Sequence, residues 1–284
     1  MSQPVNHRIS QLKIAQKRKA SAKPLFVFVA ACALLLLSAL QLAHAQRTPL
    51  RIAAAADLQP VLPPILDQFQ KTTGIQAEAT YQASAALTTQ ILNGAPFDLF
   101  LSADLSYPKR LIDAGAADAT GFPDPSSPIP YGRGTLVLWT RKDSRWPNPT
   151  LATLSDPSLK RLAIANPDRA PYGRAAIAAL TSLKLIDTLR PKFATAENIS
   201  QTAQFAETGN ADAGLISLTS AKTEHLASIG NYFVIPSNLY PPIEQGAAIV
   251  SKTSQRQNAQ KFLEFLLSPP IQQQLAKSGL TPVR

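Results

Sequence analysis

The fold is decided by residues 50–74, which read LRIAAAADLQPVLPPILDQFQKTTG. The apolar run at residues 50–55 predicts a buried strand. Apolar residues then recur at helical spacing, and Gly74 is a stop signal for that helix. The residues at helical spacing are Leu58, Leu62, Ile65, Leu66 and Phe69. A strand leading into a helix is the unit from which α/β sheets are built.

The same alternation continues along the chain. Residues 75–81 predict a strand, 86–93 a helix closed by Gly94, 97–102 a strand, and 107–114 a helix capped by Gly115. After a Pro/Ser-rich linker at 123–128, strands are expected at 135–140, 161–165, 213–217 and 245–250, with helices at 175–183 and 257–267. This order implies sheets of parallel strands with helices on their faces.

We therefore predict two α/β lobes, each a mainly parallel sheet flanked by helices, with the ligand cleft between them. Lobe 1 would contain residues 46–127 and 241–284, and lobe 2 residues 128–240. The chain would cross between the lobes twice, since it turns again near Tyr240-Pro241-Pro242.

Residues 1–45 predict a secretory signal peptide. Six basic residues and no acidic one lie in residues 1–23, and an apolar run follows at residues 25–42 and ends in Ala43-His44-Ala45. We expect cleavage after Ala45 and release into the periplasm. Two alternatives remain open. One is an uncleaved anchor, because the run is near the ~20-residue spanning length. The other is lipidation at Cys32, against which the continuing apolar run argues.

Composition excludes several chemistries. Six of the 28 basic residues lie in the signal, so 22 basic and 18 acidic residues remain, with no basic cluster that would indicate a nucleic-acid partner. The signal also contains the only cysteine and two of the three histidines. The mature chain would then lack disulfides, thiolate nucleophiles and His/Cys sites for a metal cation. His225 lies in a polar stretch and is expected on a solvated helix face, so we expect no enzyme.

Four predicted turns lead from a strand into a helix. They are residues 55–58, 81–87, 166–174 and 196–199. Helix N-termini present unpaired N–H groups and a partial positive charge, so they bind dianions without a lysine. Each hydrogen bond to a charged group contributes about 1.5–3 kcal/mol, so four converging turns would hold a small anion tightly. The alternative is a set of ordinary capped helices, because Asp57 and Ser84 are good N-caps in any protein.

Several segments resemble the molybdate-binding proteins of bacterial ABC importers. The most specific is residues 89–104, TQILNGAPFDLFLSAD, which is similar to the family block QIxxGAPxDxFxSAD. Residues 167–180 and 196–214 resemble two further family segments, so the resemblance covers nearly the whole mature chain. It implies a type II periplasmic-binding-protein fold that binds molybdate or tungstate and delivers it to a permease in the inner membrane. It also implies a monomer without a cofactor.

The resemblance also implies which residues bind the oxyanion. Ser84 matches a serine whose hydroxyl and N–H both donate. Tyr172 and Ile199 match positions that donate their backbone N–H. The candidate ligand-binding residues are Ala56, Asp57, Ala83, Ser84, Tyr172, Ile199, Ser217 and Arg174.

Two positions depart from the family. Its first-turn serine falls at Ala56 or Asp57, so that hydroxyl is missing. A carboxylate 4 Å from a single negative charge repels it by about 4 kcal/mol at an effective dielectric near 20, so we expect Asp57 to turn away and cap its own helix. Ser217 stands where some members carry a ligand-binding tyrosine. Arg174 is either a new cationic contact or a surface residue. A receptor for another small anionic or organic solute therefore stays open, and an enzyme on this fold is a further alternative.

The signal peptide gives the first testable prediction. The exported protein is expected to begin at Gln46, because Ala43-His44-Ala45 fits the small-x-small cleavage pattern. N-terminal sequencing of the exported chain measures this. A chain that retains residues 1–45, or one that starts at a lipid-modified Cys32, would contradict it.

Overall fold

Two β-sheets flanked by helices make up the computed structural model, which describes residues 48–282. The first sheet has the strand order β2-β1-β3-β11-β4, and β5 also pairs with β11. Strand β1 is parallel to β2 and β3, whereas β11 is antiparallel to β3, β4 and β5. The strands are β1 (Leu50–Ala55), β2 (Ala77–Gln82), β3 (Leu99–Ser102), β4 (Ala117–Asp118), β5 (Ile129–Gly134) and β11 (Ile243–Val250).

The second sheet has the order β10-β6-β9-β7-β8. Strand β7 is parallel to β8 and β9, and β6 is antiparallel to β9 and β10. These strands are β6 (Leu136–Arg141), β7 (Leu162–Ala165), β8 (Phe193–Ala196), β9 (Ala213–Ser217) and β10 (Gly230–Val234). The predicted α/β fold is confirmed. The sheets are mixed rather than mainly parallel. Two neighbouring parallel strands need a crossover connection, usually a helix, between them. The strands that carry the chain from one sheet to the other have no such helix and pair antiparallel.

The helices that the sequence predicted lie close to their predicted positions, and α6, α8, α10, α11 and α13 are additional. The α-helices are α3 (Leu62–Thr73), α4 (Ser84–Leu92), α5 (Ser106–Asp113), α6 (Leu151–Ser155), α7 (Pro171–Ser182), α8 (Ile186–Leu189), α9 (Ile199–Glu207), α10 (Leu218–Ala221), α11 (Glu224–Ile229), α12 (Arg256–Leu266) and α13 (Pro269–Lys277), with 3-10 turns η1 (Ala56–Leu58), η2 (Arg190–Lys192) and η3 (Ser237–Leu239). Helix α3 begins four residues later than the periodicity suggests, with Pro63 and Pro64 in its first turn, where a missing N–H costs little. Among residues 48–282, no helix is long and apolar enough to span a membrane.

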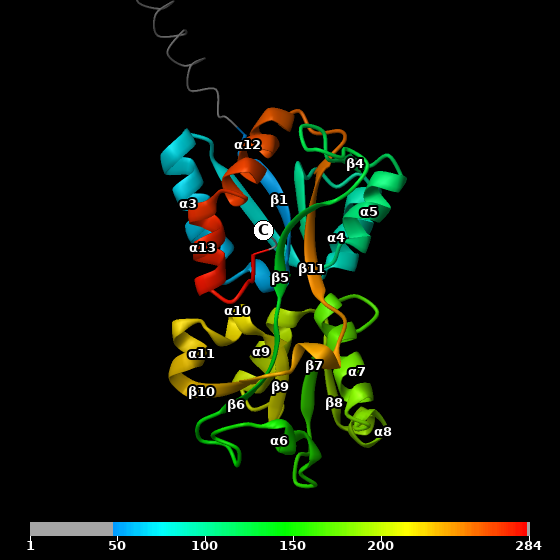
Figure 1. Cartoon of the computed structure of the whole chain (residues 1–284), viewed down its shortest axis with the longest axis vertical. Coiled ribbons are helices and arrows are strands. Elements are labelled where there is room, and N and C mark those ends of the chain that lie inside the picture. The colour runs from blue at the N-terminus through cyan, green and yellow to red at the C-terminus, as the bar shows by residue number, and fades with distance from the viewer. Residues whose placement is uncertain (1–47, 283–284) are drawn as a thin grey trace, which may run out of the picture. The chain divides into compact units, whose positions relative to one another are not determined.

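The chain passes from the first sheet to the second between Gly134 and Leu136, and returns between Val234 and Ile243 (Figure 1). A Cβ on Gly134 would lie 2.2 Å from the Tyr172 hydroxyl oxygen, so only glycine fits this crossing. Strand β5 pairs in the first sheet, although the sequence placed it in lobe 2. The lobe boundaries stay a prediction, and the signal peptide lies outside the described residues.

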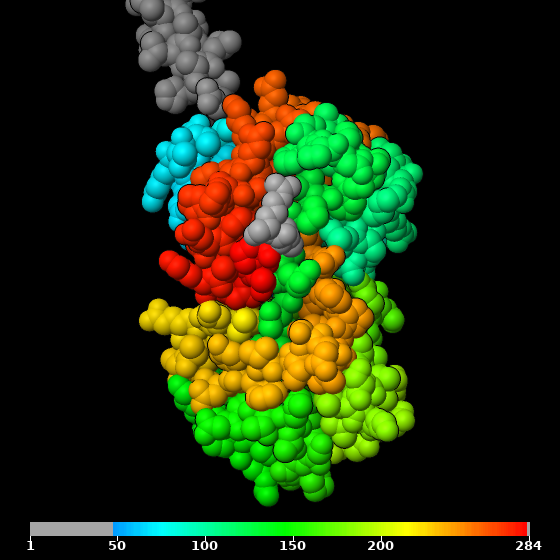
Figure 2. Space-filling model, viewed as in Figure 1, coloured from blue at the N-terminus to red at the C-terminus, as the bar shows by residue number. Residues whose placement is uncertain are grey.

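The two sheets also meet through helices. Figure 2 shows the C-terminal segment in red against the yellow segment that contains α10 and α11. There Gly279, just after α13, lies against Leu218 of α10, whose Cγ would be 2.8 Å from a Cβ on that glycine. The segment that follows α13 therefore contacts α10 on this face.

The first sheet packs against α3, α12 and α13 through a buried apolar core. At its centre the rings of Phe69 and Phe262 meet edge to face, with centroids 5.1 Å apart. Such a pair contributes about 0.5–1.5 kcal/mol beyond the area it buries.

Replacement of Phe262 by alanine should lower the free energy of unfolding by about 3–5 kcal/mol, because the buried ring leaves a cavity. Urea unfolding measures this. Val234→Ala is the control, since Val234 is 45% exposed and its truncation should change stability by less than about 0.5 kcal/mol. Equal losses in the two variants would contradict the core position of Phe262.

Candidate functional site

The four turns that the sequence singled out meet at one small cavity. Its volume is about 10 Å³, near the room that one ordered water needs. The lining residues are Ala55, Ala56, Asp57, Gln82, Ala83, Ser84, Ala103, Ala170, Pro171, Tyr172, Asn198 and Ile199. Six of the eight candidate residues are among them: Ala56, Asp57, Ala83, Ser84, Tyr172 and Ile199.

Three α-helices start at this cavity. Ser84 is the first residue of α4, Tyr172 the second of α7, and Ile199 the first of α9. The N–H groups of a first helical turn have no acceptor within the helix, and the helix dipole makes this end positive. A Cβ on Gly173 would lie 2.3 Å from the carbonyl oxygen of Ala165, so the start of α7 packs directly on the end of β7. The geometry suits a small anion.

Ser84 adds a side-chain hydroxyl to these backbone groups. The residue is 1% exposed, and its Oγ accepts a bond from the Ala103 N–H at 3.2 Å. A hydroxyl that accepts a bond keeps its own proton to donate. Ser84 therefore retains a donor at the cavity.

Asp57 is fully buried and does not cap its helix. Its Oδ2 accepts from the hydroxyl of Tyr172 at 3.0 Å and from Nε2 of Gln245 at 2.5 Å. The expectation of a helix cap is therefore wrong. The turn η1 is only three residues long, and the carboxylate meets two side-chain donors from α7 and β11 instead. Its Oδ1, like Oε1 of Gln245, is buried without a hydrogen-bond partner.

Burial changes the protonation of this carboxyl group. Desolvation raises the pKa of Asp57 from 3.8 to about 6, and the bonds from Gln245 and Tyr172 oppose that rise. The net rise corresponds to about 3 kcal/mol against the charged form. Burial, followed by the charge of Asp57, also raises the pKa values of Tyr131 and Tyr172, so both phenols stay neutral.

Groups from the second sheet hold the turn that carries Asp57. The hydroxyl of Ser200 in α9 donates to the carbonyl oxygen of Ala56 at 2.8 Å. The hydroxyl of Thr219 in α10 donates to the carbonyl oxygen of Asp57, also at 2.8 Å. The carbonyl groups of Ala56 and Asp57, which follow strand β1 of the first sheet, are thus fixed by helices that cover the second sheet.

Ser217 and Arg174 do not line the cavity. The Oγ of Ser217 caps α10 by accepting from the N–H of Ser220 at 3.2 Å, so it is engaged locally. Arg174 pairs with Asp104 at 2.6 Å and donates to the hydroxyl of Tyr107 at 2.9 Å. It therefore links α7 to residues beyond β3 outside the cavity.

Sequence reasoning missed several groups at the site. Asn198 lines the cavity and caps α9, accepting from the Gln201 N–H at 3.0 Å. An asparagine before a helical run is a cap signal that the sequence contains. Gln245, Ser200 and Thr219 carry no such local signal, since their partners lie far away in the chain.

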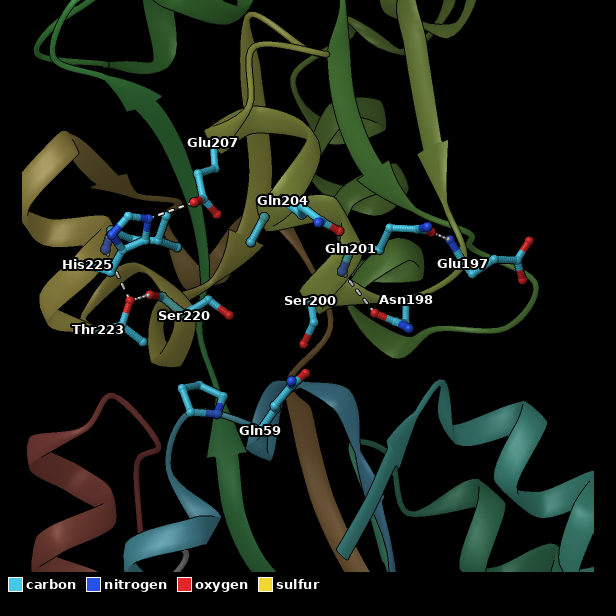
Figure 3. A pocket seen from close by; sticks show the side chains of 13 residues that line it. Gln59, Glu197, Asn198, Ser200, Gln201, Gln204, Glu207, Ser220, Thr223 and His225 are labelled. Carbon is cyan, nitrogen blue, oxygen red and sulfur yellow. Dashed lines mark hydrogen bonds and ion pairs between the residues drawn. The ribbon is translucent and has the colours of Figure 1, made fainter.

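A larger polar groove of about 640 Å³ lies beside the cavity (Figure 3). Gln59 faces the α9 residues Ser200 and Gln201 across it, and Asn198 lines both the groove and the cavity. At its far end His225 lies on α11, 64% exposed, with Nε2 2.6 Å from Oε1 of Glu207. The solvated helix position expected for His225 is confirmed.

Comparisons with known proteins agree with this geometry. A family model described as bacterial extracellular solute-binding protein matches residues 50–281. The chain is 34% identical over 225 residues to the molybdate-binding protein ModA of Azotobacter vinelandii, covering 79% of this chain and 86% of that protein. It is 35% identical over 211 residues to ModA of Rhodobacter capsulatus, covering 74% and 79%.

A solved structure is also similar. The periplasmic molybdate-binding protein of Azotobacter vinelandii superposes with a TM-score of 0.76 at 29% identity, covering 83% of this chain and 100% of that one. The resemblance stated from the sequence is thereby confirmed. Since the family model and these relatives span most of its length, the chain belongs to the family of bacterial extracellular solute-binding proteins.

Proposed function

We propose that this chain is the extracytoplasmic receptor of an ABC importer and binds a tetrahedral oxyanion, molybdate or tungstate. One observation carries the proposal: the starts of α4, α7 and α9 and the hydroxyl of Ser84 converge on one buried cavity with no cationic side chain in its lining. Relatives named as molybdate-binding proteins support the choice of anion.

Neutral donors suit a dianion that must be released again. Four hydrogen bonds to a charged ligand contribute about 6–12 kcal/mol in total, before the entropy lost on association. A lysine or arginine in the cavity would slow release. Molybdate and sulfate carry the same charge and four acceptor oxygens, so the size of the cavity would discriminate between them.

Entry of the anion requires the two sheets to separate. The cavity is near the size of one water, and a four-oxygen anion is larger. The two crossings, at residues 134–136 and 234–243, are the segments about which the sheets would turn. In this proposal the closed, liganded form docks on a permease, works as a monomer in the periplasm, and needs neither cofactor nor catalysis.

Calorimetry on residues 46–284 with molybdate, tungstate, sulfate and phosphate tests the function. We expect molybdate and tungstate to bind tightly, and sulfate and phosphate to bind more weakly because their oxygens span a smaller volume. Failure of all four anions to bind would refute the oxyanion receptor. Preferential binding of an organic anion would show that the chain is a receptor for another class of solute.

Ser84→Ala should weaken molybdate binding about tenfold or more, because a donor worth about 1.5–3 kcal/mol to a charged ligand is lost. Titration calorimetry of the variant measures this. Ser182→Ala serves as the control, since the Ser182 hydroxyl donates to the Leu239 carbonyl at the other end of α7. If Ser84→Ala bound molybdate with wild-type affinity, the assignment of Ser84 as a ligand-binding residue would be wrong.

A further inference from the structure

Asp57 is a buried acidic side chain beside a cavity suited to anions. It lines the cavity, has no exposed surface, and has donors only on Oδ2. Its Oδ1 is buried without a partner. A buried charge with half of its acceptor capacity unpaired costs several kcal/mol, so the ionised form fits this position poorly.

Among residues 48–282, no cationic side chain pairs with Asp57. The side chains that approach it are neutral: Tyr172 from α7, Gln245 from β11 and Tyr131 from β5. The charged groups on the elements packed around it are engaged elsewhere, in the pairs Arg133–Glu244, Arg174–Asp104, Arg169–Glu197 and His225–Glu207. On β2, Glu78 is exposed to solvent, and burial raises the pKa of Tyr81 to about 12. Within residues 48–282, a proton is therefore the one partner that can neutralise this carboxylate.

An anion in the cavity would add to this cost. Its oxygens would meet the first-turn N–H groups in the same small cavity that Asp57 lines. Two negative groups in one desolvated site repel each other far more strongly than in water. We propose that Asp57 carries a proton when the sheets close on the anion, so that anion binding takes up one proton from solution.

The sign of the pH dependence follows from the two states. When the sheets separate and water reaches the carboxyl group, its pKa returns toward the ordinary 3.8; in the closed state it is about 6. The closed state is therefore favoured as pH falls. The gain is complete below about pH 4 and is lost as pH rises through 6. A bound dianion moves this upper limit higher, because it disfavours the ionised carboxylate further.

The inference rests on the proposed function and is tested by titration calorimetry of residues 46–284 with micromolar molybdate at pH 6.0. Two buffers of different ionisation enthalpy, MES and bis-Tris, report the number of protons taken up. We expect about 0.5 proton or more per anion, and affinity about fourfold or more tighter at pH 5.5 than at pH 8.0.

Two variants sharpen the test. Asp57→Asn has the same shape and still accepts from Tyr172 and Gln245, so it should bind molybdate without proton uptake and with no such pH dependence. Asp98→Asn is the matched control, because Asp98 is also buried but is satisfied by the Arg51 N–H and the Thr253 hydroxyl. It should keep the proton uptake of the wild type.

The outcomes separate the two proposals. Molybdate binding by the wild type with no proton uptake at pH 6.0 refutes the protonation of Asp57 and leaves the receptor function intact. Absence of binding to any of the four oxyanions refutes the receptor function, and the inference with it. The proton uptake of the wild type tests the protonation of Asp57 even if Asp57→Asn does not fold.

Discussion

The short turn η1 is the contact on which the rest of the site depends. It continues strand β1 of the first sheet, yet its carbonyl oxygens accept from α9 and α10 of the second. Because the backbone of η1 is held by both the first sheet and the helices of the second, the side chain of Asp57 is fully buried. The same arrangement brings three helix starts within reach of one cavity. In the proposed receptor, closure of the sheets would therefore complete the site.

The site separates attraction from repulsion by geometry. In the proposed receptor, attraction would come from backbone N–H groups and Ser84, which are neutral and fixed by the starts of three helices. Repulsion comes from Asp57, whose carboxyl group is turned toward Tyr172 and Gln245 at the crossings between the sheets. A neutral carboxyl group would remove that repulsion, whereas a charged one would favour open sheets. The proposal thus couples anion affinity to the protonation of this one group.

The residues that contact Asp57 lie near the two crossings between the sheets. Gly134 admits the hydroxyl of Tyr172 where no Cβ would fit, and Gln245 lies on the returning strand. A rotation of one sheet against the other changes the distance between Asp57 and Tyr172, because α7 moves with the second sheet, whereas Gln245 stays with Asp57 in the first. The polar groove beside α9 shares Asn198 with the cavity, so the two hollows are adjacent.

The sequence by itself determined the α/β class, most helix and strand positions and the four turns. These depend on local periodicity and on glycine stops such as Gly74, whose φ of 71° an L side chain resists. Strand β5 was missed because it contains Pro130, Gly132 and Gly134 and extends only through its pairing with β11. The orientation of Asp57 was missed for the same reason. Its donors lie 115 and 188 residues away, so the choice between a helix cap and a buried cluster was decided by tertiary burial alone.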